Sequence, residues 1–97
     1  MQFSPELRER VADGTITVSY RLWSRPKVRV GGVYQSGPVT IEVDEVDLVP
    51  FLSITDEDLA QTGEPDREAL RRRAAHAGPI HDDTLLYRVE FHVVNKR

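Results

Sequence analysis

Residues 39–49 have the sequence VTIEVDEVDLV, in which apolar and polar side chains alternate as in a β-strand with one buried face. The apolar residues fall on odd positions up to Val43 and then on even positions at Val46 and Leu48. One extra residue near Asp44 accounts for this shift and predicts a β-bulge within a long, bent strand. Such bends curve the sheets of small barrels, so the segment favours a closed or nearly closed sheet.

Two further segments alternate in the same way. Residues 15–23 and 87–93 each place apolar side chains at every second position, which predicts two more strands with one buried face. After Pro26, valines alternate with basic residues over 27–30, which predicts another short strand that ends at a turn over 31–32.

Helix signals separate these strands. Ser4, followed by proline, predicts the N-cap of a helix over about 5–12. Thr55, followed by three acidic residues, predicts a second short helix, and Asp66 predicts the cap of a third that ends near residue 77. The expected fold class is therefore α+β, a small and mostly antiparallel β-barrel with three short helices, because closure removes exposed sheet edges.

Composition limits the class of protein. A chain of 97 residues fits a single domain over 1–97, and it contains no cysteine, which excludes disulfides and fits a reducing cytoplasm. The N-terminus has no apolar run, so we expect neither a signal peptide nor a transmembrane helix. The net charge of -3 is uneven: residues 19–29 hold four basic residues and no acid, whereas 42–58 hold seven acids and no base.

The basic segment continues the outward face of the 15–23 strand. Ser19, Arg21 and Trp23 share that face, and Arg25 and Lys27 follow closely. Guanidinium groups bind phosphate bidentately and an exposed indole stacks on a base, so these five residues are the predicted ligand-binding set. The alternative is that Trp23 belongs to the core and that the charges only solvate an edge strand.

Other polar clusters have simpler explanations. The arginines of 67–73 point around much of a helix, which favours a solvated face. His76, His81 and His92 lack the spacing of metal ligands, and no glycine-rich phosphate loop is present, so we expect neither a metal nor another cofactor. The acidic stretch 42–58 leaves open a third interpretation, in which the protein is a small adaptor for a protein partner.

Five segments follow one another in a distinctive order: Gly14–Arg21, Val28–Gly31, Ile54–Asp58, Gly63–Leu70 and Tyr87–Phe91. In this order and spacing, nearly the whole chain resembles the ASCH domain, a member of the PUA-like β-barrel superfamily. The string RLWSRP at 21–26 resembles a short, actinobacterial form of that domain. The resemblance implies a PUA-like barrel that binds a nucleic acid or a modified nucleoside in a cleft between barrel and helices.

The resemblance also bears on catalysis. Gly14 and Arg21 match the two ends of the family pattern GxKxxxxR, but Ile16 stands where the pattern has lysine. Among similar proteins, small bacterial acetylcytidine amidohydrolases use a lysine, a threonine and a glutamate. Their threonine position aligns with Ser19, and their glutamate position falls at or beside Gly63.

These observations favour an RNA- or nucleotide-binding module without catalysis, because isoleucine cannot transfer a proton or activate a nucleophile. The alternative function is a hydrolase that acts on a modified nucleoside or on RNA. Ser19, Lys27 and Glu64 are its candidate catalytic residues, with Lys27 or Arg21 replacing the missing lysine.

Overall fold

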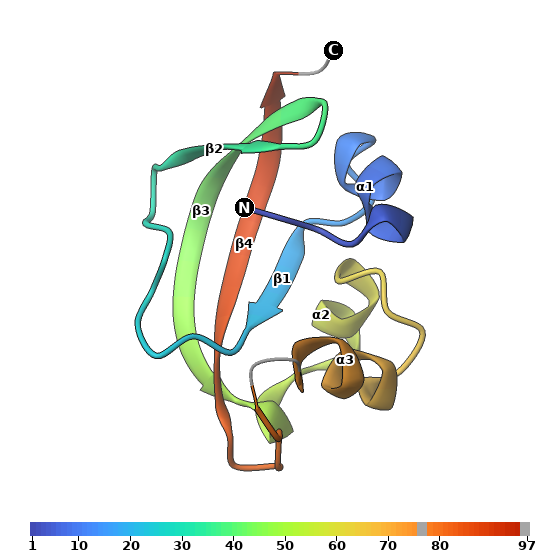
Figure 1. Ribbon diagram of the computed structural model, residues 1–97, viewed down its shortest axis with the longest axis vertical. Helices are drawn as coiled ribbons and strands as arrows, with labels where there is room; N and C mark the ends of the chain where they lie inside the picture. The colour runs from blue at the N-terminus through green and yellow to red at the C-terminus, as the bar shows by residue number, and fades with distance from the viewer. Residues whose placement is uncertain (76–77, 96–97) are drawn as a thin grey trace.

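The computed structural model describes residues 1–75 and 78–95 (Figure 1). In chain order, its elements are α1 (Pro5–Ala12), β1 (Val18–Arg21), β2 (Val33–Ser36), β3 (Val39–Pro50), the 3-10 helix η1 (Phe51–Ser53), α2 (Asp56–Gln61), α3 (Arg67–Ala74) and β4 (Leu85–Asn95). All strand pairs are antiparallel, in the order β1-β4-β3-β2. The predicted α+β class with three short helices is therefore confirmed.

The sheet curls into a half-barrel whose edges are β1 and β2. Figure 1 shows the three helices gathered on the β1 side, while β2 lies on the opposite side of the long β3–β4 pair. A loop over residues 22–32 connects the two edge strands. Among the described residues, no helix is long and apolar enough to cross a membrane.

The predicted bulge lies where the sequence phase shifts. Val43 pairs with Phe91 and Glu45 pairs with Glu90, so Asp44 is the extra residue of β3. Before the bulge the odd residues are buried as expected, but after it Leu48 is 50% exposed. The bulge bends β3 across β4 and gives the sheet its curl.

The predicted strand over 27–30 is wrong, and the edge strand is β2 at Val33–Ser36. A strand would put Val28 and Val30 on one face, yet Val28 is buried and Val30 is 62% exposed. The end of the loop bonds to β3 at the bulge: the Gly31 N–H donates to the Val43 carbonyl (2.7 Å), and the Val43 N–H donates to the Gly32 carbonyl (2.9 Å). This long-range attachment replaces the predicted short strand.

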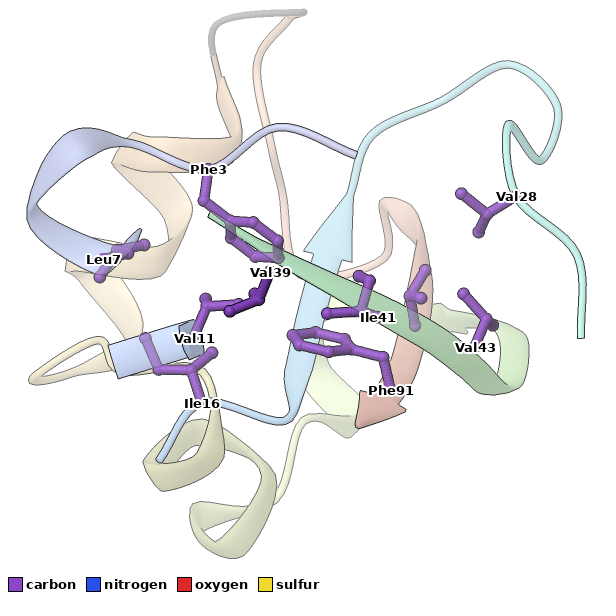
Figure 2. Close-up of a cluster of buried hydrophobic side chains, with 10 residues drawn as sticks. Phe3, Leu7, Val11, Ile16, Val28, Val39, Ile41, Val43 and Phe91 are labelled. Carbon is purple, nitrogen blue, oxygen red and sulfur yellow. The ribbon is translucent and has the colours of Figure 1, made fainter. Parts of the chain in front are cut away.

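The hydrophobic core consists of two clusters. The first, shown in Figure 2, joins the N-terminal segment, α1 and the loop to the sheet. Its buried members are Phe3, Leu7, Val11, Ile16, Val28, Val39, Ile41, Val43, Val89 and Phe91. The second cluster packs α3 and η1 on the sheet through Val18, Tyr20, Phe51, Ile54, Leu70, Ala74, Ile80 and Leu86.

Two of the three predicted helix caps form as expected. The Thr55 hydroxyl accepts from the Asp58 N–H (3.1 Å), and the Asp66 carboxylate accepts from the Ala69 N–H (2.8 Å). Ser4 occupies the N-cap position of α1, but its hydroxyl accepts from Arg73 instead. The third helix ends at Ala74, and its predicted end near residue 77 lies outside the described residues.

The bulge carries a pH-dependent ion pair. Both carboxylate oxygens of Asp44 lie 2.9 Å from the His92 Nδ1, and this hydrogen bond raises the pKa of His92 above its ordinary value. The pair therefore stabilises the fold while His92 is protonated, and the contribution is lost as pH rises through the raised pKa.

We expect Asp44→Asn to lower the pKa of His92, measured by NMR titration of the imidazole. Asp47→Asn, on the same strand, is the control, and an equal His92 pKa in both variants would contradict the pairing.

Candidate functional site

A cavity of about 440 Å³ lies between the two core clusters. Phe3 and Leu7 of the first cluster line one side of it, and Leu70 and Ala74 of the second line the other. The volume falls within the range of pockets that hold small organic ligands. The cavity is thus a gap in the packing where the N-terminal segment, β1 and α3 meet.

The cavity follows the free edge of β1. Successive strand residues point to opposite faces, yet all four residues of β1 line the cavity, together with Leu22 and Trp23. Since β1 pairs with β4 along its other edge, the cavity must lie against the unpaired edge. The edge of the half-barrel is therefore also the wall of the candidate site.

Arg21 lines the cavity and has no acidic ion-pair partner among the described residues. Its Nε donates to the Ser19 hydroxyl (2.7 Å), its Nη2 donates to the Gln2 carbonyl (2.6 Å), and its guanidinium carbon lies 4.9 Å from the centre of the Phe3 ring. Burial lowers the pKa of Arg21, but the group remains charged at neutral pH. No carboxylate among the described residues forms an ion pair with it.

The predicted ligand-binding residues divide into two groups. Ser19, Arg21, Trp23 and Lys27 line the cavity, whereas Arg25 is exposed outside it. The face is not the open outward surface that the sequence suggested, because Ser19 is only 9% exposed. The segment before α1 covers it through the bond from Arg21 to Gln2.

Trp23 is half-buried at the cavity wall. Its ring centre lies 6.1 Å from that of Tyr87, with the two planes tilted by 36°. This contact holds the indole against the sheet, and the first core cluster packs on it as well. Trp23 is therefore partly a core residue and partly cavity lining, and its stacking on a base stays a prediction.

A buried ion pair forms another part of the lining. The Glu64 side chain is 3% exposed, and its carboxylate accepts from the Arg73 Nε. Arg73 also donates to the Ser4 hydroxyl (2.7 Å) and pairs with Glu6 (3.0 Å). The bond to Glu64 raises the pKa of Arg73.

Sequence reasoning missed this role of Arg73 by assigning the arginines of 67–73 to a solvated face. Arg71 and Arg73 instead donate to groups of other elements, which include Ile80 and Glu64. The sequence did indicate this role, because Arg73 lies three residues after the apolar Leu70 and therefore on the same, inward face of the helix.

A second polar network fixes β1 from its other side. Arg88 binds both carboxylate oxygens of Asp58 at 3.0 Å, and the Tyr20 hydroxyl donates to the same carboxylate (3.2 Å). Burial and the nearby Asp58 charge raise the pKa of Tyr20 to about 12, so the phenol stays neutral. These bonds attach α2 to the sheet and hold the cavity wall in place.

Ile16, at the lysine position of the resemblance, packs closely against Gly63, which lies at or beside its glutamate position. Ile16 is 1% exposed and does not line the cavity. Gly63 has a φ of +82°, and a Cβ at Gly63 would lie 2.5 Å from the Ile16 Cδ1. Neither position therefore presents an ionisable group to the site, although the neighbouring Glu64 does.

The histidines show no metal centre in the described part of the chain. Over residues 1–75 and 78–95, no three side chains of the metal-binding types come together. His81 and His92 are both exposed, and His92 pairs with Asp44. His76, the third histidine considered from the sequence, lies outside the described residues.

The sequence matches no protein-family model and no curated protein. The structure is similar to three solved structures. An ASCH domain from Lactobacillus crispatus JV V101 has a TM-score of 0.74 at 20% identity, covering 93% of this chain and 71% of that one. Protein EF3133 of Enterococcus faecalis V583, of the DUF984 family, gives 0.73 at 15% identity with the same coverage. The hypothetical protein PH0355 gives 0.72 at 14% identity, covering 97% of this chain and 96% of that one.

At these identities the similarity establishes the fold. This chain has the fold of an ASCH domain, with a curled antiparallel sheet and helices on one side. The resemblance seen in the sequence is thereby confirmed for the architecture.

The buried ion pair gives a stability prediction. Arg73→Ala should lower the free energy of unfolding by about 3 kcal/mol, because it leaves the Glu64 carboxylate buried and unpaired. Adding Glu64→Gln should recover part of that loss, since it removes the buried charge. The control Arg72→Ala, on the exposed face of the same helix, should change stability by less than about 0.5 kcal/mol. Equal stability of the Arg73 and Arg72 variants in denaturant titrations would rule the pair out as a stabilising contact.

Proposed function

We propose that this protein is an RNA- or nucleotide-binding module of the cytoplasm that holds its ligand in the β1 cavity without transforming it. One observation carries the proposal: Arg21 lines a cavity of ligand size, and no carboxylate within residues 1–75 and 78–95 pairs with it. The ASCH fold supports the proposal, because the sequence resemblance implies a nucleic-acid ligand between sheet and helices.

The distribution of ion pairs supports an anionic ligand. Arg67, Arg71, Arg73 and Arg88 each bind at least one carboxylate. Among the described residues, Arg21 bonds instead to two neutral oxygens, and Arg8 and Arg10 likewise bond to carbonyls, but of these three arginines Arg21 alone lines the cavity. Those two bonds use two of the five guanidinium N–H groups and fix its orientation, and the others are available to a phosphate.

The aromatic side chain fits the same ligand. Trp23 lines the cavity and is held by Tyr87, so its indole is a stable platform for a base. Lys27 supplies a second positive charge at the cavity from the 22–32 loop. A base on Trp23 and a phosphate at Arg21 together account for the residues of this wall.

The apolar contact between Ile16 and Gly63 supports binding without catalysis. Ile16 is buried in this contact at the position where the similar amidohydrolases have their lysine, so the site lacks that group. Ser19 has an alternative role in this proposal, since its hydroxyl accepts from Arg21 and positions the guanidinium.

Substitutions in the cavity should weaken binding. Trp23→Ala should raise the Kd for 5′-mononucleotides or a short RNA roughly 5- to 100-fold, the equivalent of one lost stacking contact. Arg21→Ala should have a comparable effect, because it removes charge-assisted hydrogen bonds to phosphate. Isothermal titration calorimetry measures both, with circular dichroism to confirm folding and Arg72→Ala as the control. Wild-type affinity in both folded variants would refute the site. If Arg21→Ala does not fold, Arg21→Lys replaces it in the binding measurement.

A second candidate function is hydrolysis of a modified nucleoside or of RNA, because Ser19, Lys27 and Glu64 line one cavity. We expect no product when the protein is incubated with acetylcytidine or with RNA, followed by chromatography. Release of cytidine and acetate, or of shorter RNA, would instead establish the hydrolase. Loss of that activity in Ser19→Ala would then assign the hydroxyl a part in the reaction.

A further inference from the structure

We propose that the 22–32 loop is a second subsite, which binds the phosphates next to the nucleotide in the cavity. The ligand is then a single-stranded nucleic acid with one nucleotide inserted at β1, and not a free nucleotide. This inference rests on the proposed function and specifies its ligand class.

The loop displays its cations at alternate positions. Arg25, Lys27 and Arg29 are all exposed, and Lys27 also lines the cavity. Arg25 and Arg29 lie two residues to either side of Lys27 and outside the cavity. In extended chain, they would be separated by at most about 14 Å. Lys27, at the cavity, thus has Arg25 before it and Arg29 after it along the chain.

The loop is held in place at several points. Val28, between two of the cations, is buried in the first core cluster (Figure 2). The Tyr34 hydroxyl accepts from the Arg29 N–H (3.0 Å), and the Gly31 N–H bonds to Val43 at the bulge. A cation on an anchored backbone needs less ordering when it binds, so these contacts favour a specific phosphate contact.

The charges of the loop are not used within the protein. Among the described residues, no carboxylate forms an ion pair with Arg25, Lys27 or Arg29. No acid occurs in the sequence between positions 18 and 41. The loop therefore carries three positive charges and no negative one, on a protein whose net charge is -3.

The chemistry of the ligand follows from this arrangement. A mononucleotide carries its phosphate on the sugar that bears its base, so with the base in the cavity the phosphate meets only the cavity cations Arg21 and Lys27. A strand carries one phosphate for each nucleotide and extends beyond the cavity on both sides. Only a strand can therefore use Arg25 and Arg29 together with the cavity.

The test compares ligands of two lengths. The Kd values of the wild-type protein for 5′-mononucleotides and for five-nucleotide RNA and DNA strands are measured by fluorescence or calorimetry between 50 and 300 mM salt. We expect a strand to bind at least about tenfold more tightly than the mononucleotide, because the two subsites act together. The RNA and DNA strands show whether the sugar contributes.

Variants then locate the second subsite. Arg25→Ala and Arg29→Ala should each reduce the slope of log Kd against log salt for a strand by about 0.7, the value for one lost phosphate contact. Neither should change the Kd for the mononucleotide. The matched control is Arg72→Ala, which removes the same charge from an exposed position of α3 and should leave the slope unchanged.

The outcomes separate the two proposals. Equal affinities for strand and mononucleotide, or unchanged slopes in both loop variants, would overturn the second subsite while the cavity site stands. Strand binding that depends on Arg25 and Arg29 but not on Arg21 would overturn both proposals, because no nucleotide would then occupy the cavity beside the loop. If the protein binds neither the mononucleotides nor the strands, both the proposed function and the second subsite are overturned.

Discussion

At Asp44 the pairing of β3 with β4 skips one residue, and the strand bends there. The bend curls the sheet, and the backbone of Val43 just before it bonds to Gly31 and Gly32 at the end of the loop. The loop is thus fixed to β3 directly before the bulge, and Lys27 lies four residues before this attachment. A regular β3 would give a flatter sheet.

The parts of this structure that were predictable from the sequence have local causes. A shift in the alternation of β3 reveals its bulge, and the hydroxyl or carboxylate of a capping residue bonds only three positions away. Errors arose where the cause is distant in sequence. The predicted strand over 27–30 fails because the loop bonds to Val43, and Ser19 is buried because the segment before α1 folds over it.

The candidate site shows the same division. Alternation grouped Ser19, Arg21 and Trp23, which do line the cavity, but Val18 and Tyr20 line it too, because the cavity follows the free edge of β1. The pair of Glu64 with Arg73 was not predicted. A helix arginine that contacts another element has the same local sequence pattern as one that contacts water. Alternation can group side chains, but only the packing of α3 and the N-terminal segment decides which of them enclose a cavity.

The contact between Ile16 and Gly63 also limits how this chain could change in evolution. A lysine at position 16 would place an ammonium group where the present side chain is 1% exposed, at a cost of several kcal/mol without a partner. An acid at position 63 would need a backbone with φ of +82° and space that Ile16 now fills. Both substitutions are therefore unfavourable in the present packing, so a lysine at position 16 or an acid at position 63 would require the surrounding side chains and backbone to change as well.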